Sequence, residues 1–233
     1  MAFDDYDEYE QSEQLRKWLR ENGLSIVVGV VLALALIFGW RQWQSHRAGH
    51  HAQAAEQYVA LESALAAGQD AQVDSAATAL EKSYVDTPYA ALGAAARANV
   101  AVAQGKLDAA QAALQWAVDH SPTPALHAVY MLRLARVELA QDHAQQALTL
   151  LGGVPDDSYR ATLEELRGDA LLKLGREAQA RSAYANALAA LSAHTVPGMR
   201  DALQMKLDNL AQAGGATAAP SVSKTTAPGK QGT

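Results

Sequence analysis

The sequence predicts an all-α protein in which one membrane-spanning helix precedes a stack of paired helices. Three observations carry this prediction: an uncharged apolar run over 23–40, helical periodicity after residue 48, and prolines at nearly constant intervals. Composition agrees, because 49% of the residues are hydrophobic but only 6% are aromatic, so alanine supplies much of the apolar surface. Many small contacts suit closely packed helices better than a β-sandwich, which favours β-branched and aromatic residues.

Charge, cysteine content and the absence of motifs exclude several classes of function. The formal net charge is −6 and no stretch gathers Lys and Arg on one face, so we expect no nucleic-acid partner. The chain has no cysteine, which excludes disulfides, thiolate metal sites and cysteine nucleophiles. No phosphate-binding loop or nucleophile elbow occurs, so we expect no catalytic residue, no cofactor and no enzyme. His46 and His50 lie four apart but lack a third ligand, so we also expect no metal site.

Residues 1–22 are predicted to form an acidic cytoplasmic tail. Two interpretations remain open: a disordered, solubilising segment, or a short binding motif for a cytoplasmic partner, followed by an amphipathic start at Leu15. The tail carries seven acidic residues: Asp4, Asp5, Asp7, Glu8, Glu10, Glu13 and Glu21.

Residues 23–43 are predicted to form a transmembrane helix in contact with membrane lipid. From Leu24 to Trp40 there are 17 uncharged residues, of which eleven are Leu, Ile, Val or Phe. They extend over about 25 Å as a helix, nearly the thickness of the hydrocarbon core. A cleaved signal peptide would have a basic leader and an Ala-x-Ala-like site, and a soluble core helix would have a polar stripe. Because all three features are missing, we expect an uncleaved, single-pass anchor.

The flanking charges and the small residues of this helix lead to two further expectations. Three cations precede the span and two follow it, which favours a cytoplasmic N-terminus and a periplasmic C-terminal domain in a bacterial inner membrane. Ser25, Gly29 and Ala33 fall four apart, a spacing that builds helix–helix contact faces in lipid. The alternative is that small residues are simply common in such helices.

The chain behind the span shows an internal repeat. Pro88, Pro122, Pro155 and Pro197 are separated by 34, 33 and 42 residues. A period near 34 predicts stacked helix–turn–helix units of the tetratricopeptide type. Three units align over roughly 90–122, 128–159 and 161–188, and a looser pair precedes them.

Within this alignment, small residues fill the positions where two helices approach closely. Gly105, Asp142 and Gly175 fall at the turns of the three units. In the third unit Gly168 takes a small position and Tyr184 the aromatic one. The first two units place alanines at the equivalent small positions.

The last amphipathic segment, over 199–212, is predicted to cap the stack. Leu203, Leu207 and Leu210 are expected to face inward, and Arg200, Lys206 and Asp208 to face water. The fold prediction is therefore an N-terminal transmembrane helix, then a tetratricopeptide-repeat-like α-solenoid with a C-terminal capping helix. The periplasmic domain covers 48–212, and the Gly-, Pro-, Ser- and Thr-rich residues 213–233 form a disordered tail.

Five segments of the chain resemble the YfgM family, the ancillary subunits of the SecYEG translocon. They are "TPYA" at 87–90, "LQWAVD" at 114–119, "LRLARV" at 132–137, "ELRGD" at 165–169 and "LQMKLDNL" at 203–210. The resemblance covers roughly residues 1–212 and implies the same topology and repeat domain.

As partners the resemblance implies the SecYEG translocon, a membrane-anchored periplasmic chaperone of the prolyl-isomerase class (PpiD), and exported client proteins. The implied function is a scaffold that links emerging periplasmic or envelope proteins to chaperones. The alternative is a negative regulator of an envelope-stress response, which would act through the cytoplasmic tail.

Repeats of this kind bind segments along the face formed by the first helix of each pair, and the register predicts which residues line it. In this groove Asn99 alone matches the basic and amide set that grips a terminal carboxylate, so we do not expect that mode. A mixture of aliphatic and oppositely charged residues suits a partner helix or an unfolded segment. The alternative is that many of the aliphatic residues form the core between repeats. The predicted protein-binding groove comprises Asn99, Val102, Leu132, Arg136, Leu139, Glu165, Asp169 and Lys173.

Overall fold

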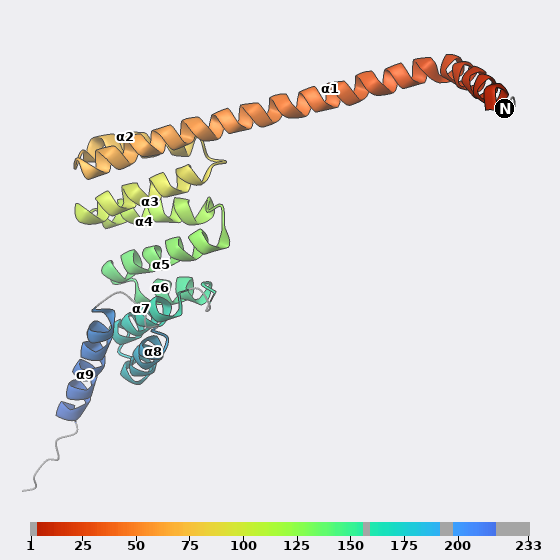
Figure 1. The fold of residues 1–233 in the computed structure, drawn as a ribbon. Helices are drawn as coiled ribbons and strands as arrows, with labels where there is room; N and C mark the ends of the chain where they lie inside the picture. Colours follow the sequence, from red (N-terminus) through yellow and green to blue (C-terminus); the bar gives the residue numbers. More distant parts are fainter. Residues whose placement is uncertain (1–3, 156–158, 192–197, 218–233) are drawn as a thin grey trace, which may run out of the picture. The chain divides into compact units, whose positions relative to one another are not determined.

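The computed structural model describes residues 4–155, 159–191 and 198–217, with all their side chains except those of 4–15, 26 and 213–217. The described residues form helices joined by short turns, with no strand among them, which confirms the predicted all-α class (Figure 1). The helices are α1 Asp4–Ala66, α2 Asp70–Ser83, α3 Pro88–Ala103, α4 Leu107–Asp119, α5 Pro124–Ala140, α6 Ala144–Gly152, α7 Arg160–Lys173, α8 Glu177–Ala189 and α9 Met199–Thr217.

The chain divides into two compact units, residues 1–56 and residues 57–233. In the first unit the backbone is already helical at Asp4, where a disordered segment was one of the two predicted interpretations. The predicted boundaries at 43 and 48 both fall inside α1, so no break in the helix marks them. From Val27 onward, α1 includes an 18-residue window of mean hydropathy 1.4 in which no residue is buried. This part of the helix is long and apolar enough to cross a membrane.

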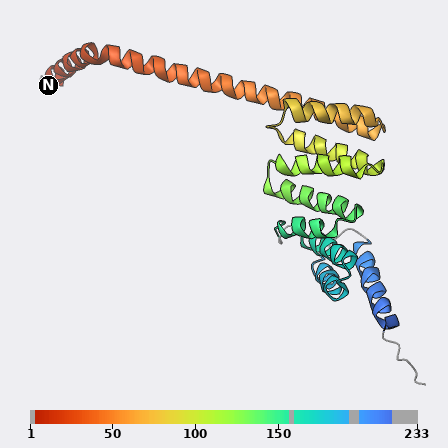
Figure 2. The ribbon, with the colours of Figure 1, turned by 180° about the vertical axis from the view of Figure 1, so that it is seen from behind.

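In the second unit the helices follow one another as a stack of pairs. Each helix from α2 to α8 packs against the next one, and α5 also contacts α7, the first helix of the next pair. Figures 1 and 2 show the pairs α3/α4, α5/α6 and α7/α8 in this order, with α9 after α8. These are the three units that the proline spacing predicts.

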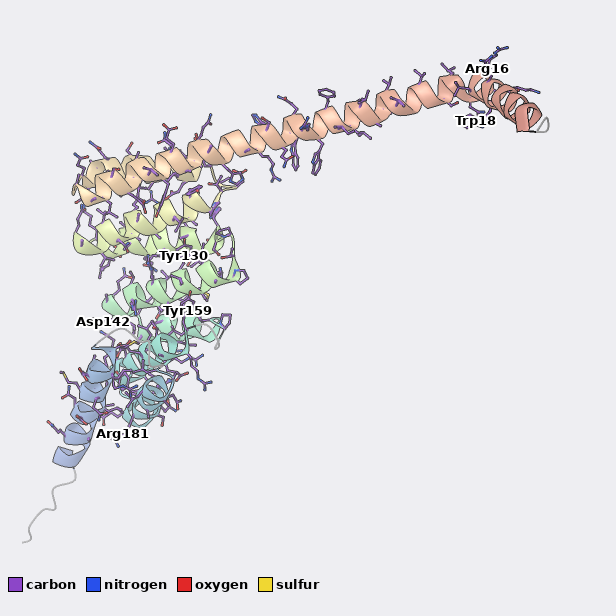
Figure 3. All side chains as sticks on the ribbon, viewed as in Figure 1. Arg16, Trp18, Tyr130, Asp142, Tyr159 and Arg181 are labelled. Atoms are coloured by element: carbon purple, nitrogen blue, oxygen red, sulfur yellow. The ribbon has the colours of Figure 1, made fainter. Side chains whose placement is uncertain are left out.

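The turns inside the three units share one backbone geometry. Gly105, Asp142 and Gly175 have φ values of 71°, 63° and 72°, in the left-handed region that favours glycine. After Gly105, the amide of Lys106 donates to the carbonyl of Ala101 at 2.8 Å, closing the helix end in the Schellman manner. Asp142, labelled in Figure 3, therefore replaces the turn glycine as predicted, at a steric cost that glycine does not have.

Small residues let the helices approach closely, and Gly168 of α7 shows this most clearly. A Cβ atom at Gly168 would lie 2.4 Å from Cε1 of Tyr184, so the ring occupies the space that a side chain would need. Tyr184 is 1% exposed, and its hydroxyl donates to Asp169 at 2.7 Å. The predicted small and aromatic positions of the third unit therefore meet in the core.

Helix α9 covers the last pair, as the predicted cap should. Leu203 and Leu210 are buried against Ala180, Tyr184 and Ala187 of α8, and Leu207 packs against the same cluster. The α8 residue Arg181, labelled in Figure 3, donates to the backbone carbonyl of Leu210 at 3.0 Å. The helix continues to Thr217, beyond the predicted end at 212, and residues 218–233 of the predicted disordered tail lie outside the described residues.

Candidate binding groove

Three of the predicted groove residues lie together between α3 and α5. Asn99 and Val102 project from α3 and Arg136 from α5 into one hollow of about 360 Å³. Leu107 and Leu114 of α4 add apolar surface to it. The complete lining is Ala98, Asn99, Val102, Leu107, Leu114, Arg133, Arg136, Val137 and Ala140.

Two predicted groove residues of α5 lie in the core instead. Leu132 and Leu139 are only 4% and 6% exposed and belong to the hydrophobic cluster of α3 to α7. Their neighbours Arg133 and Ala140 line the hollow. Leu132 and Leu139 therefore do not line an open groove. The residue after each of them does, which corresponds to a rotation of about 100° around the axis of α5. The physical reason is that leucines gain more than arginine or alanine from burial between repeats.

The predicted groove acids of α7 are held by the capping helix. Lys206 of α9 donates to Glu165 at 2.9 Å and to both carboxylate oxygens of Asp169 at 2.7 and 2.9 Å. The prediction that Lys206 faces water is only partly right, because 31% of its side chain is exposed while the ammonium group contacts these two carboxylates and lies 5.4 Å from the Tyr184 ring. The C-terminal end of the predicted groove therefore carries a satisfied ionic cluster.

This cluster changes the proton affinities of two of its members. Burial tends to lower the pKa of Lys206, but its hydrogen bonds to Asp169 and Glu165 outweigh burial and raise that pKa above its ordinary value. Burial raises the pKa of Tyr184 strongly, and the hydrogen bond to Asp169 and the charge of Glu165 add to this effect. Both groups therefore hold their protons more firmly than in an unfolded chain.

Lys173, the remaining predicted cation on α7, forms an ion pair with Asp142 in the α5–α6 turn. This contact lowers the pKa of Asp142, chiefly through the hydrogen bond from Lys173. The pair is exposed, so its contribution to stability is small. The side chain of Lys173 is still accessible to a binding partner, and its role in the groove stays a prediction.

Two arginines distinguish the N-terminal end of the groove. Among the described residues, neither Arg133 nor Arg136 takes part in an ion pair or in a side-chain hydrogen bond. One turn before Arg133, Tyr130, labelled in Figure 3, has a buried hydroxyl that forms no hydrogen bond with any residue that the structure describes. Burial raises the pKa of Tyr130, and the charge of Arg133 opposes that rise.

The sequence interpretation missed Arg133, Val137 and Ala140 of α5. The pattern that identifies them is the spacing 133, 136, 137 and 140, which follows one face of a helix. Sorting α5 by polarity instead of by alignment to the other units places the two arginines together on this face.

A larger hollow of about 800 Å³ lies elsewhere, between α2, α3 and α4. Five of its twelve lining residues are alanine, and within it Gln104 donates to Asp70 at 2.6 Å. It contains none of the predicted groove residues. We assign the candidate site to the smaller hollow, which combines predicted residues with arginines that have no carboxylate partner in the described chain.

The predicted contact face of the membrane helix lies on α1. Ser25, Gly29 and Ala33 are exposed there, and their role in a helix–helix contact stays a prediction. Near the end of the span, the rings of Trp40 and Trp43 are 5.2 Å apart and Arg47 lies over Trp43 at 4.6 Å. Such an aromatic and cationic belt is typical of a membrane–water interface.

The part of the chain that the structure describes contains no group of three or more His, Cys, Asp or Glu residues arranged to hold a metal ion. Glu164 is buried and forms an ion pair with Arg167 at 2.6 Å. It therefore has a structural role in α7.

A family model and several known proteins match most of the chain. Residues 16–212 match a family model described as "Tetratricopeptide repeat-like domain". An Escherichia coli protein named "Ancillary SecYEG translocon subunit" is 32% identical over 206 residues, covering 88% of this chain and 97% of its own length. Proteins of the same name from Haemophilus influenzae and Aggregatibacter actinomycetemcomitans are 31% and 30% identical, each covering 78% of this chain and 88% of their own. No solved structure matches the chain.

Proposed function

Because the chain belongs to the family of ancillary SecYEG translocon subunits, the YfgM family that its sequence resembles, we propose that it is a translocon-associated scaffold of the bacterial inner membrane. Its relatives carry that association in their names. The observation that carries the proposal for this chain is an open groove on a helical-repeat domain that follows one apolar helix. The scaffold binds emerging periplasmic or envelope proteins in the groove and links them to periplasmic chaperones, including the membrane-anchored PpiD.

The composition of the groove supports binding of a protein segment. Val102 is 46% exposed, and Asn99 and Arg136 are exposed beside it, so apolar, amide and cationic groups are all accessible. A partner helix or extended segment uses such a mixture, because apolar contacts give affinity and polar contacts fix orientation. The proposal contains no catalytic step.

The orientation proposed is a cytoplasmic N-terminus and a periplasmic repeat domain. Arg16, Lys17 and Arg20 precede the apolar run, and Arg41 and Arg47 follow it. The excess of cations on the N-terminal side favours retaining that side in the cytoplasm. With this orientation the groove faces the compartment into which exported chains emerge.

Photo-crosslinking in native membranes tests the proposal. A photo-reactive amino acid at Asn99, Arg136 or Lys173 is expected to capture translocon subunits, periplasmic chaperones or exported chains. The matched controls are Gln115 on α4 and Gln145 on α6, both exposed on second helices of their pairs. If the groove positions capture none of these proteins, or capture them no better than the controls, the proposal is wrong.

The same membranes separate the scaffold from the regulatory alternative. Deleting residues 2–12 removes five of the seven acidic residues of the tail and leaves the repeat domain unchanged. A scaffold keeps its groove crosslinks after this deletion. A raised envelope-stress response together with unchanged crosslinks would instead show that the tail restrains that response, a separate regulatory activity.

A further inference from the structure

Arg133 and Arg136 bring two positive charges to the groove between α3 and α5, and no described residue forms an ion pair with either of them. Residues three apart on a helix have Cβ atoms about 5–6 Å apart, so the two guanidinium groups share one face of α5 and repel each other. Both line the hollow, and Asn99 adds an amide from α3. An arginine pair of this kind is stabilised when an anion enters between the two side chains.

Three acids of α5 and α7 near this groove are already engaged. Lys206 holds both Glu165 and Asp169. Glu138, on another face of α5, accepts from Gln111 at 2.7 Å and pairs with His143 at 3.0 Å. Within the described residues, therefore, none of these carboxylates is available to neutralise the arginine pair. On α1, burial and the charge of Glu62 raise the pKa of Tyr58 and the charge of Arg133 opposes that rise, so Glu62 and Arg133 both act on this phenol.

The remainder of the hollow is apolar. Leu114 and Val137 are only 2% and 4% exposed, whereas Val102 presents an accessible aliphatic surface and Leu107 a half-buried one. A volume of about 360 Å³ accommodates a few side chains and no bulky ligand. An anion alone would leave this apolar surface wet, and an aliphatic group alone would leave the arginines unpaired.

We propose that this groove recognises a protein segment in which the side-chain carboxylate of Asp or Glu stands beside aliphatic residues. The carboxylate lies between Arg133 and Arg136, with Asn99 as a further donor, and the aliphatic neighbour packs on Val102 and Leu107. The inference rests on the proposed function, because it names the class of segment that the scaffold binds. It makes the groove selective for acidic–apolar segments over basic ones.

Peptide selection on the full-length protein in detergent tests the inference even while the natural partner is unidentified. The probe is a display library of randomised twelve-residue peptides with no free C-terminus, so that only side-chain carboxylates are available. We expect the bound pool to be enriched at least about twofold in Asp and Glu next to Leu, Ile, Val or Phe, relative to the input library. A pool with unchanged or lower acid content overturns the inference.

Variants localise the effect. For a selected peptide, Arg133→Gln combined with Arg136→Gln is expected to weaken binding about tenfold or more, because each arginine contributes a charge-assisted hydrogen bond. The matched control is Arg160→Gln with Arg176→Gln, which removes the same charge from exposed arginines outside the groove. Circular dichroism and thermal melting establish that both double variants fold. Equal loss in the two double variants, or no loss in either, contradicts the inference.

Two further measurements keep the outcomes distinct. An amidated peptide in which Gln replaces each acid should bind about tenfold more weakly to the wild-type protein; if only its free-acid form regains binding, the groove reads a chain terminus and the inference is wrong. Photo-crosslinking at Asn99 reports on the proposed function separately. Capture of translocon subunits with no acid preference refutes only the inference, whereas no capture from any groove position refutes the proposed function.

Discussion

Replacing Gly168 by alanine should destabilise the last helix pair, although alanine is the better helix former. The added Cβ would lie 2.4 and 2.5 Å from Cε1 and Cδ1 of Tyr184, about 1 Å inside ordinary contact. The ring is 1% exposed, and its hydroxyl is held by Asp169 at 2.7 Å, so it has little freedom to move away. Overpacking of this kind costs about 1–3 kcal/mol, and the gain in helix propensity is about 1 kcal/mol. Because contacts of 2.4 and 2.5 Å are severe, the cost falls in the upper half of that range, about 2–3 kcal/mol, and the expected net loss is about 1–2 kcal/mol.

The matched control is Gly93→Ala in α3. There a Cβ would lie 3.0 Å from Cδ1 of Leu80, a buried side chain that has to shift by only a few tenths of an ångström, and 3.5 and 3.6 Å from Cα of Ala77 and Cδ1 of Leu61. The propensity gain offsets this milder contact, so stability should stay within about 0.5 kcal/mol of the wild type.

Thermal melting of the full-length protein in detergent, followed by circular dichroism, measures both variants. At about 2–4 °C per kcal/mol for a chain of this size, Gly168→Ala should lower the Tm by about 2–8 °C and Gly93→Ala should leave it nearly unchanged. Hydrogen exchange should accelerate in α7 to α9 for Gly168→Ala alone, because a solenoid loses structure locally. If Gly168→Ala is as stable as Gly93→Ala, the close approach of the ring is not what determines stability here.

Three further predictions concern the same repeats. Lys206→Met should lower the free energy of unfolding by about 1–3 kcal/mol, because Glu165 and Asp169 lose their shared cation. Hydrogen exchange in α9 should accelerate in this variant, and unchanged exchange there would contradict the prediction. Since the pKa of Tyr184 is raised in the folded state, its contribution is complete below the ordinary value of 10.0 and is lost as pH rises above it. The Tm of the wild type should therefore fall more steeply between about pH 10 and 11 than that of Tyr184→Phe, and parallel curves would refute the coupling. Gly105→Ala should cost about 1–2 kcal/mol, read from melting, because the turn has a φ of 71°, and no loss would mean that the turn relaxes.

Much of the fold follows from local rules that the sequence displays directly. A left-handed turn residue after each first helix, small residues at the close approaches and a proline between units define the repeat. Asp142 could be assigned to a turn because it aligns with Gly105 and Gly175, and all three have the same φ region. Periodicity alone therefore predicts the stack and its pairs.

The details that failed depend on neighbours far away in the sequence. The orientation of α5 differs by one residue from the predicted register because the packing of α3, α4 and α7 decides which side of α5 is buried. A helical wheel places Lys206 on the solvated side of its helix, but its carboxylate partners are 37 and 41 residues away in α7. Helical periodicity identifies a polar residue without showing what it faces.

Protease access in intact spheroplasts most directly tests whether this chain is an anchored scaffold with a periplasmic binding domain. Added protease should digest the repeat domain and leave a fragment that contains the apolar helix around 23–43, while a cytoplasmic marker protein stays intact. Protection of the repeat domain until the membrane is permeabilised would place the groove in the cytoplasm. That result would contradict the proposed binding of emerging envelope proteins, whatever the groove binds in isolation.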